Sequence, residues 1–183
     1  MISLPAQHAL QQMVHRAIQA SPLVLEGFMA NITDLPDLSR LGTQQVVLLT
    51  VSCYQFRLLL LIHFSPDAQT YAHFATVNKL APAEMGEQSF IDAIRECANR
   101  CCGNLNRDLA RVFTHVGMST PNIIDRRCVD SLDKLGEGYL QHFALQQPNG
   151  PAFGVSICVN AFTPLDFAYE ATAAQETGAL EMF

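Results

Sequence analysis

A helical repeat of apolar residues, running from Ser89 to Phe113, constrains the fold of this chain more than any other feature. Its spacing of three and four residues is that of one helical face, sustained for about six turns at roughly 3.6 residues per turn. The residues of this face are Ile91, Ile94, Ala98, Cys101, Leu105, Leu109 and Val112. The pattern therefore predicts a long helix, beginning as early as Ala83, with one side buried against the rest of the protein.

The opposite side of this predicted helix carries Asp92, Glu96, Asn99 and Gly103. A glycine inside a helix costs about 0.5–1 kcal/mol relative to alanine, so its presence on an exposed side needs a reason. One reason is that another backbone or a bulky partner approaches this side closely. The alternative is a helix that ends at Cys102 and is capped by the glycine. The apolar period continues in phase beyond the glycine, which favours the uninterrupted helix.

The order Asp92-x3-Glu96-x2-Asn99, followed by Gly103 and Pro121, resembles the signature of the CheX/CheC/FliY family of chemotaxis phosphatases. Between the asparagine and the proline there are 21 residues, one fewer than in the usual pattern of the family. The first predicted helix contains no Glu-x-x-Asn, so the chain resembles a single-site, CheX-like member. The resemblance spans roughly residues 5 to 163 of the 183 residues.

The resemblance implies a phosphatase that hydrolyses the aspartyl phosphate of a CheY-like receiver domain. Glu96 would pair with the active-site lysine of the receiver, and Asn99 would orient the attacking water. Mg²⁺ is expected on the receiver, and no metal or other cofactor is expected on this chain. A homodimer is implied as well. The remaining residues expected at the contact with the receiver are Asp92, Arg95, Arg100 and Gly103.

The chemistry of the two central side chains fits this expectation. Neither Glu96 nor Asn99 is a strong nucleophile, and asparagine cannot act as an acid or a base. The pair can form one ion pair and orient one water, which suits a substrate that brings its own metal and leaving group. Two alternatives remain open: a module that binds the receiver without catalysis, and a scaffold subunit that uses this side for assembly. Taken alone, both side chains are also typical of a solvated helix surface.

The rest of the sequence predicts an α+β protein, with helices packed on an antiparallel sheet. The resemblance implies two long helices side by side on that sheet, and two helix–hairpin units suggest a pseudo-repeat. Residues 23–32 are ambiguous between helix and strand, 34–42 resemble a loop, and 166–183 are either a loose tail or a short helix. The predicted elements are a helix over 5–20, a hairpin of 46–51 and 56–64, a helix over 66–77 capped by Ser65, an extended segment 122–124, a charged connector 125–137, and a second hairpin of 137–145 and 152–162 around a PNGP turn.

Composition bounds the function further. A length of 183 residues and a hydrophobic content of 49% predict one domain, 1–183, with a sizeable core. The net charge of −6 argues against nucleic acid as a partner. Ser52, Gln55 and Arg57 interrupt the strongest apolar run, which argues against membrane insertion. The N-terminus lacks the features of a signal peptide, so the expected location is the cytoplasm.

The six cysteines are therefore expected to be reduced thiols. Cys97, Cys101 and Cys102 are close enough on one helix to raise the question of a metal or redox site. Burial as small hydrophobic residues is the favoured interpretation, because no C-x-x-C pair or histidine cluster completes a ligand set. His63, on an apolar strand, is likewise expected to be a core residue.

Overall fold

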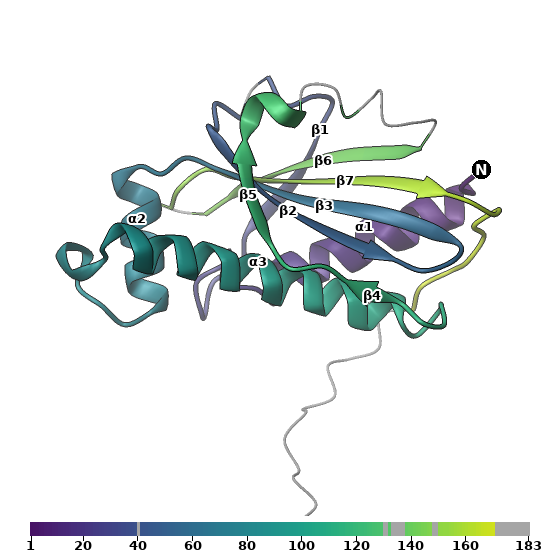
Figure 1. Ribbon diagram of the computed structural model, residues 1–183, viewed down its shortest axis with the longest axis horizontal. Helices are drawn as coiled ribbons and strands as arrows, with labels where there is room; N and C mark the ends of the chain where they lie inside the picture. The colour runs from purple at the N-terminus through teal and green to yellow at the C-terminus, as the bar shows by residue number, and fades with distance from the viewer. Residues whose placement is uncertain (40, 130–131, 133–137, 148–149, 171–183) are drawn as a thin grey trace, which may run out of the picture.

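The computed structural model describes residues 1–39, 41–129, 132, 138–147 and 150–170. These residues form three α-helices and seven strands (Figure 1). The helices are α1 (Leu4–Gln19), α2 (Ala68–Val77) and α3 (Glu87–Leu109). The strands are β1 (Asn31–Leu35), β2 (Gln45–Ser52), β3 (Phe56–Phe64), β4 (Gly117–Met118), β5 (Asn122–Asp125), β6 (Tyr139–Gln146) and β7 (Phe153–Ala161). The predicted α+β class is confirmed.

One sheet contains all seven strands, in the order β1–β6–β7–β3–β2–β4, with β5 also pairing with β2. Every pairing between these strands is antiparallel. The two predicted hairpins are β2–β3 and β6–β7, and β3 pairs with β7 at the centre of the sheet. The pseudo-repeat of two helix–hairpin halves stays a prediction.

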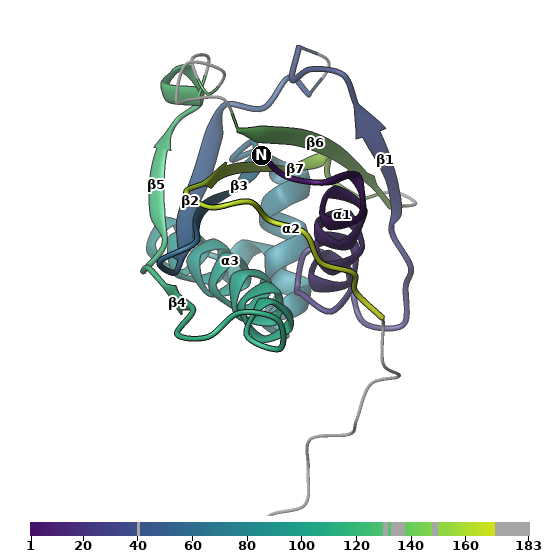
Figure 2. The ribbon, with the colours of Figure 1, turned by 90° about the vertical axis from the view of Figure 1, so that its right-hand side faces the viewer.

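One face of the sheet is covered by α1 and α3, which lie side by side in Figure 2. Alternate residues of the central strands point to this face and form the main core with the apolar stripes of the helices. Asp108, buried near the end of α3, joins the two helices: its Oδ1 lies 3.2 Å from Nη1 of Arg16 on α1. The hydroxyl of Tyr169 donates to the other carboxylate oxygen at 2.9 Å.

The opposite face of the sheet carries a smaller core, formed by residues from β2 and β3 together with Leu38, Val129 and Leu132. The near-continuous hydrophobicity of β2 and β3 is explained by this coverage on both faces. His63 is fully buried on this side, as predicted, and its Nε2 lies 2.8 Å from Oγ of Ser156. Burial, with Arg126 and His142 nearby, lowers the pKa of His63 to about 3, so this imidazole is neutral at physiological pH.

The long helix was predicted correctly at its centre and wrongly at its end. Gly103 lies inside α3, which confirms the uninterrupted helix. The helix stops at Leu109, however, and Val112 is 39% exposed rather than on the buried stripe. Beyond Leu109 the chain tightens into turns that bring Phe113 into the core, where its ring meets Phe56 at a centroid distance of 4.9 Å. Tertiary packing of one aromatic ring therefore overrides the helical period.

Three other boundaries differ from the predictions. The second helix begins at Ala68, and its cap is Asp67 rather than Ser65, because the Asp67 carboxylate accepts a hydrogen bond from the amide of Thr70 at 2.9 Å. The ambiguous stretch 23–32 consists mainly of turns and ends in β1, which also takes two residues from the expected loop. Residues 82–84 form a separate 3₁₀ turn rather than the start of α3.

The segment after β7 packs along α1 and is neither helical nor loose as far as residue 170 (Figure 2). Leu165 is buried and exchanges backbone hydrogen bonds with Met1 and Ser3. The Ser3 hydroxyl also donates to Asp166 at 2.6 Å. The predictions for 171–183, for most of the connector 130–137 and for the centre of the PNGP turn fall outside the described residues. In the described part of the chain, no helix is both long and apolar enough to cross a lipid bilayer.

Candidate functional site

The outer side of α3 exposes the residues that the sequence singled out. Asp92, Glu96 and Asn99 are exposed, and Gly103 is half-buried at the same side. A methyl group added at Gly103 would meet no atom within 4 Å. Packing within this chain therefore does not require a glycine here, although the glycine weakens the helix. The cost is explained if a partner outside the chain approaches this side.

A shallow hollow of about 270 Å³ lies beside this side of α3. Its walls are four helix residues, Asp92, Arg95, Glu96 and Asn99, and two residues of the β4–β5 connection, Thr120 and Pro121. The fold thus brings the proline of the sequence pattern next to its glutamate and asparagine, although 21 residues separate Asn99 from Pro121.

The β4–β5 connection is held in place by the edge of the sheet. The amide of Ser119 donates to the carbonyl of Thr50 on β2 at 2.8 Å, and the amide of Thr50 donates back to the Ser119 hydroxyl at 2.9 Å. β4 runs next to α3 in Figure 1, and Pro121 lies between β4 and β5, both of which pair with β2. The wall of the hollow opposite the helix is therefore fixed by backbone pairing.

A second hollow of about 410 Å³ lies on the other side of Glu96, between α3 and the end of α2. Glu96 and Asp92 line both hollows, so they form a ridge between them. Asp92 accepts a hydrogen bond from the Gln88 side chain, one turn earlier, at 3.0 Å. The exposed apolar residue Leu80 contributes to the second hollow. The carboxylates of Asp92 and Glu96 therefore project between two concave surfaces that are open to a partner.

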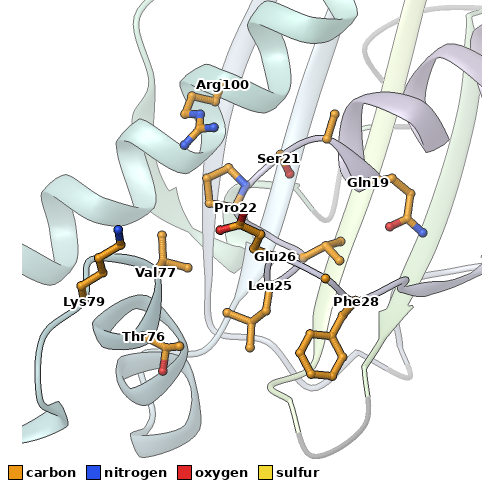
Figure 3. Close-up of a pocket in the computed structure, with 13 residues that line it drawn as sticks. Gln19, Ser21, Pro22, Leu25, Glu26, Phe28, Thr76, Val77, Lys79 and Arg100 are labelled. Carbon is orange, nitrogen blue, oxygen red and sulfur yellow. The ribbon is translucent and has the colours of Figure 1, made fainter. Parts of the chain in front are cut away.

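The structure separates one predicted residue from the others. Arg100 turns away from the Glu96–Asn99 hollow and lines a larger cavity of about 700 Å³ between α3 and the ends of α1 and α2 (Figure 3). Asp92, Arg95, Glu96 and Asn99 stay together, and Gly103 lies one turn beyond Asn99 on the open side of the helix. Their roles at a contact with a receiver remain predictions.

The three cysteines of α3 belong to the core rather than to a site. Cys97, Cys101 and Cys102 are all buried. Burial raises the pKa of Cys101 and of Cys102 to about 12 and that of Cys97 well above its usual value, so the thiols stay protonated at neutral pH. Among the described residues, no group of three or more histidine, cysteine, aspartate or glutamate side chains is arranged to hold a metal ion.

Sequence reasoning missed the residues that other segments contribute to the hollows. Thr120 adjoins Pro121 and could have been suggested by that proximity. Asn78 and Leu80 lie far from the motif in the sequence, and no pattern in the chain connects them to it. Only the packing of α2 against α3 brings them to Glu96.

Comparison with known proteins supports the fold. No protein-family model matches the sequence, and no curated protein matches it. Among solved structures, a CheC-like superfamily protein from Shewanella sp. PV-4 superposes with a TM-score of 0.60 at 12% identity, over 87% of this chain and 99% of that one. CheX from Vibrio vulnificus superposes with a TM-score of 0.57 at 13% identity, over 83% of this chain and 97% of that one. A chain of the complex of CheX with CheY, BeF3 and Mg from Borrelia burgdorferi superposes with a TM-score of 0.61 at 11% identity, over 84% of this chain and 96% of that one.

These likenesses extend over nearly the full length of each neighbour. At 10–13% identity they concern the arrangement of helices and strands. The predicted α+β class with an antiparallel sheet matches the fold of these neighbours. The neighbours in structure are CheX- and CheC-like chemotaxis proteins, and this protein has their fold.

Proposed function

We propose that this protein accelerates hydrolysis of the aspartyl phosphate on a CheY-like receiver domain. The receiver docks on the outer side of α3, where Glu96 forms an ion pair with the receiver's active-site lysine. The Asn99 carboxamide enters the phosphorylation site and orients a water for in-line attack. The receiver supplies the metal ion and the leaving carboxylate, so this chain contributes neither a nucleophile nor a metal.

The observation that carries the proposal is the hollow lined by Glu96, Asn99 and Pro121. Both polar side chains are exposed on a rigid helix, and the neighbouring glycine leaves open space for an approaching loop. A CheX protein of the same fold has been solved in complex with CheY, BeF3 and Mg, which supports a receiver as the partner. One well-placed amide and one ion pair are sufficient for an acceleration of about a hundredfold, which needs about 2.7 kcal/mol.

The test is the decay of radiolabelled phosphate on receiver domains of the same organism, with and without this protein. We expect faster decay for at least one receiver, and we expect Asn99→Ala to remove about a hundredfold of acceleration while binding persists. A matched control is Gln12→Ala, which changes another exposed amide, on α1. If Asn99→Ala keeps the full rate, the catalytic assignment is wrong. Binding to phosphorylated receivers without acceleration would instead identify a docking module.

A further inference from the structure

A cavity that is larger than either hollow beside Glu96 lies outside the Glu96–Asn99 hollow (Figure 3). We call it the α1–α2 cavity, because it is enclosed by the end of α1, the turns of residues 20–28, the end of α2 and one residue of α3. Its volume of about 700 Å³ falls within the range of about 300–1,000 Å³ that is typical of small-molecule sites. We propose that this cavity binds a small amphipathic anion, with a carboxylate or phosphate attached to an apolar or aromatic body.

The charges around the cavity favour an anion. Two cations reach it from different elements: Arg100 from α3, and Lys79 from just beyond α2. One carboxylate, that of Glu26 in the turns of residues 20–28, also lines the cavity, so the charged lining is net positive in a chain whose net charge is −6. In Figure 3 Arg100 and Lys79 lie on the side of the cavity away from Phe28, separate from each other. A locally positive concavity on an acidic protein attracts and orients small anions.

The backbone at Lys79 also points to a role for its side chain. Lys79 has a φ of 57°, in the left-handed region that favours glycine after the end of a helix. A lysine is conformationally disfavoured in this position, and its side chain lines the cavity. Glycine would serve the turn better, and it would remove the charge.

The turns that form one wall of the cavity are held in place by side chains from elsewhere in the fold. The Gln147 carboxamide accepts from the amide of Leu25 at 3.2 Å and donates to the carbonyl of Leu23 at 2.6 Å. His73 Nε2 donates to the carbonyl of Pro22 at 2.8 Å. The wall is therefore formed before any ligand arrives, which lowers the entropic cost of binding.

The apolar residues that line the cavity are the reason for proposing an apolar or aromatic body in the ligand. Val24 is buried in the floor, Leu25 and Val77 are half-buried, and Phe28 is 54% exposed at the rim. Figure 3 shows Phe28 on the far side from the two cations. An anionic group beside Lys79 and Arg100 would thus direct an attached ring toward the apolar wall.

The experiment is an NMR titration of the full chain with phenyl phosphate, compared with inorganic phosphate and with benzyl alcohol. We expect saturable shifts of amides within residues 20–28 and 76–79, with inorganic phosphate and benzyl alcohol each binding at least about tenfold more weakly. Lys79→Gly and Arg100→Met should each weaken phenyl phosphate about fivefold, because each removes one exposed charge. Glu26→Gln should strengthen it, since the opposing carboxylate is lost.

The variants are chosen to keep the fold. Lys79→Gly suits a φ of 57°, and methionine is a good helix former at the exposed position 100. No saturable shift in these two segments overturns the proposal, as does binding that none of the three charge variants changes. Shifts centred on Glu96 and Asn99 would mean that the probe imitates the phosphoryl group at the other hollow. Asn99→Ala separates the two sites, because it should leave the titration of the α1–α2 cavity intact whether or not the protein is a phosphatase.

Discussion

The two long helices on the sheet, α1 and α3, differ in how far one row of their side chains contacts the rest of the chain. On α3 the stripe is Asp92, Glu96, Asn99 and Gly103, and on α1 the residues at identical spacing are His8, Gln12, His15 and Gln19. On α1 two of these side chains, His15 and Gln19, contact other parts of the chain. On α3 the stripe is open, with a hollow on either side of its glutamate.

The contacts of α1 explain this difference. His15 packs edge-on against Phe143 of β6 at a centroid distance of 5.1 Å. The Gln19 side chain forms two hydrogen bonds with the backbone of Ala30, which leads into β1. The C-terminal segment runs along α1 as well, with its Tyr169 hydroxyl bonded to Arg16 at 2.7 Å. The side chains of His15 and Gln19 are therefore used in contacts within the chain, whereas Asp92 and Glu96 on α3 border two open hollows.

The largest effect is expected from breaking the link between the helices. Asp108→Ala removes a buried carboxylate that holds both Arg16 and Tyr169. We expect the free energy of unfolding to fall by about 3 kcal/mol, at the lower end for a broken buried pair because Arg16 keeps some access to water. Urea denaturation followed by circular dichroism measures this. Asp92→Ala, on the exposed side of the same helix, should change it by less than about 0.5 kcal/mol.

Charge removal on the open stripe should affect binding and leave folding unchanged. Glu96→Gln deletes the carboxylate proposed to pair with the receiver's lysine and retains a good helix former. We expect the affinity for a phosphorylated receiver to fall about tenfold, or about 1.4 kcal/mol, and to lose part of its dependence on salt. Calorimetric titration at two salt concentrations measures both effects. Unchanged affinity at both concentrations would place the docking contact elsewhere.

A substitution at Gln19, on the row of α1 that contacts the rest of the chain, should lower the stability of the protein. Gln19→Ala deletes two hydrogen bonds to Ala30, so the free energy of unfolding should fall by about 1 kcal/mol. Receiver affinity should stay the same, because this side chain lies on the other helix. Thermal denaturation monitors the first effect and calorimetric titration the second. A weaker affinity would show that the receiver also reaches α1.

Gly103→Ala is expected to change stability only slightly, and in the direction opposite to Gln19→Ala. No atom lies within 4 Å of the added methyl group, so alanine should raise the free energy of unfolding by about 0.5–1 kcal/mol. If a receiver loop approaches this position, the same variant should bind it more weakly. Arg107→Ala, one turn further along α3, controls for a general effect of substitution on this side. A stabilised variant with full affinity would remove the functional explanation of the glycine.

The sequence was most informative where structure is local. The period of three and four residues identified the centre of α3 and the burial of Cys101. It failed at the end of α3, because the turn after Leu109 is decided by Phe113. That ring packs against Phe56 and Phe167, which lie far away in the sequence.

For the candidate site, too, some features follow from the sequence and others only from the tertiary structure. The spacing of Glu96, Asn99 and Gly103 on one side of a helix follows from the sequence alone, because 3.6 residues per turn fixes which side chains share a side. Only the tertiary structure decided that Pro121 would stand beside them and that Arg100 would line another cavity. Such neighbours depend on how β4 pairs with β2 and how α1 and α2 pack against α3, interactions between distant segments that no local pattern encodes.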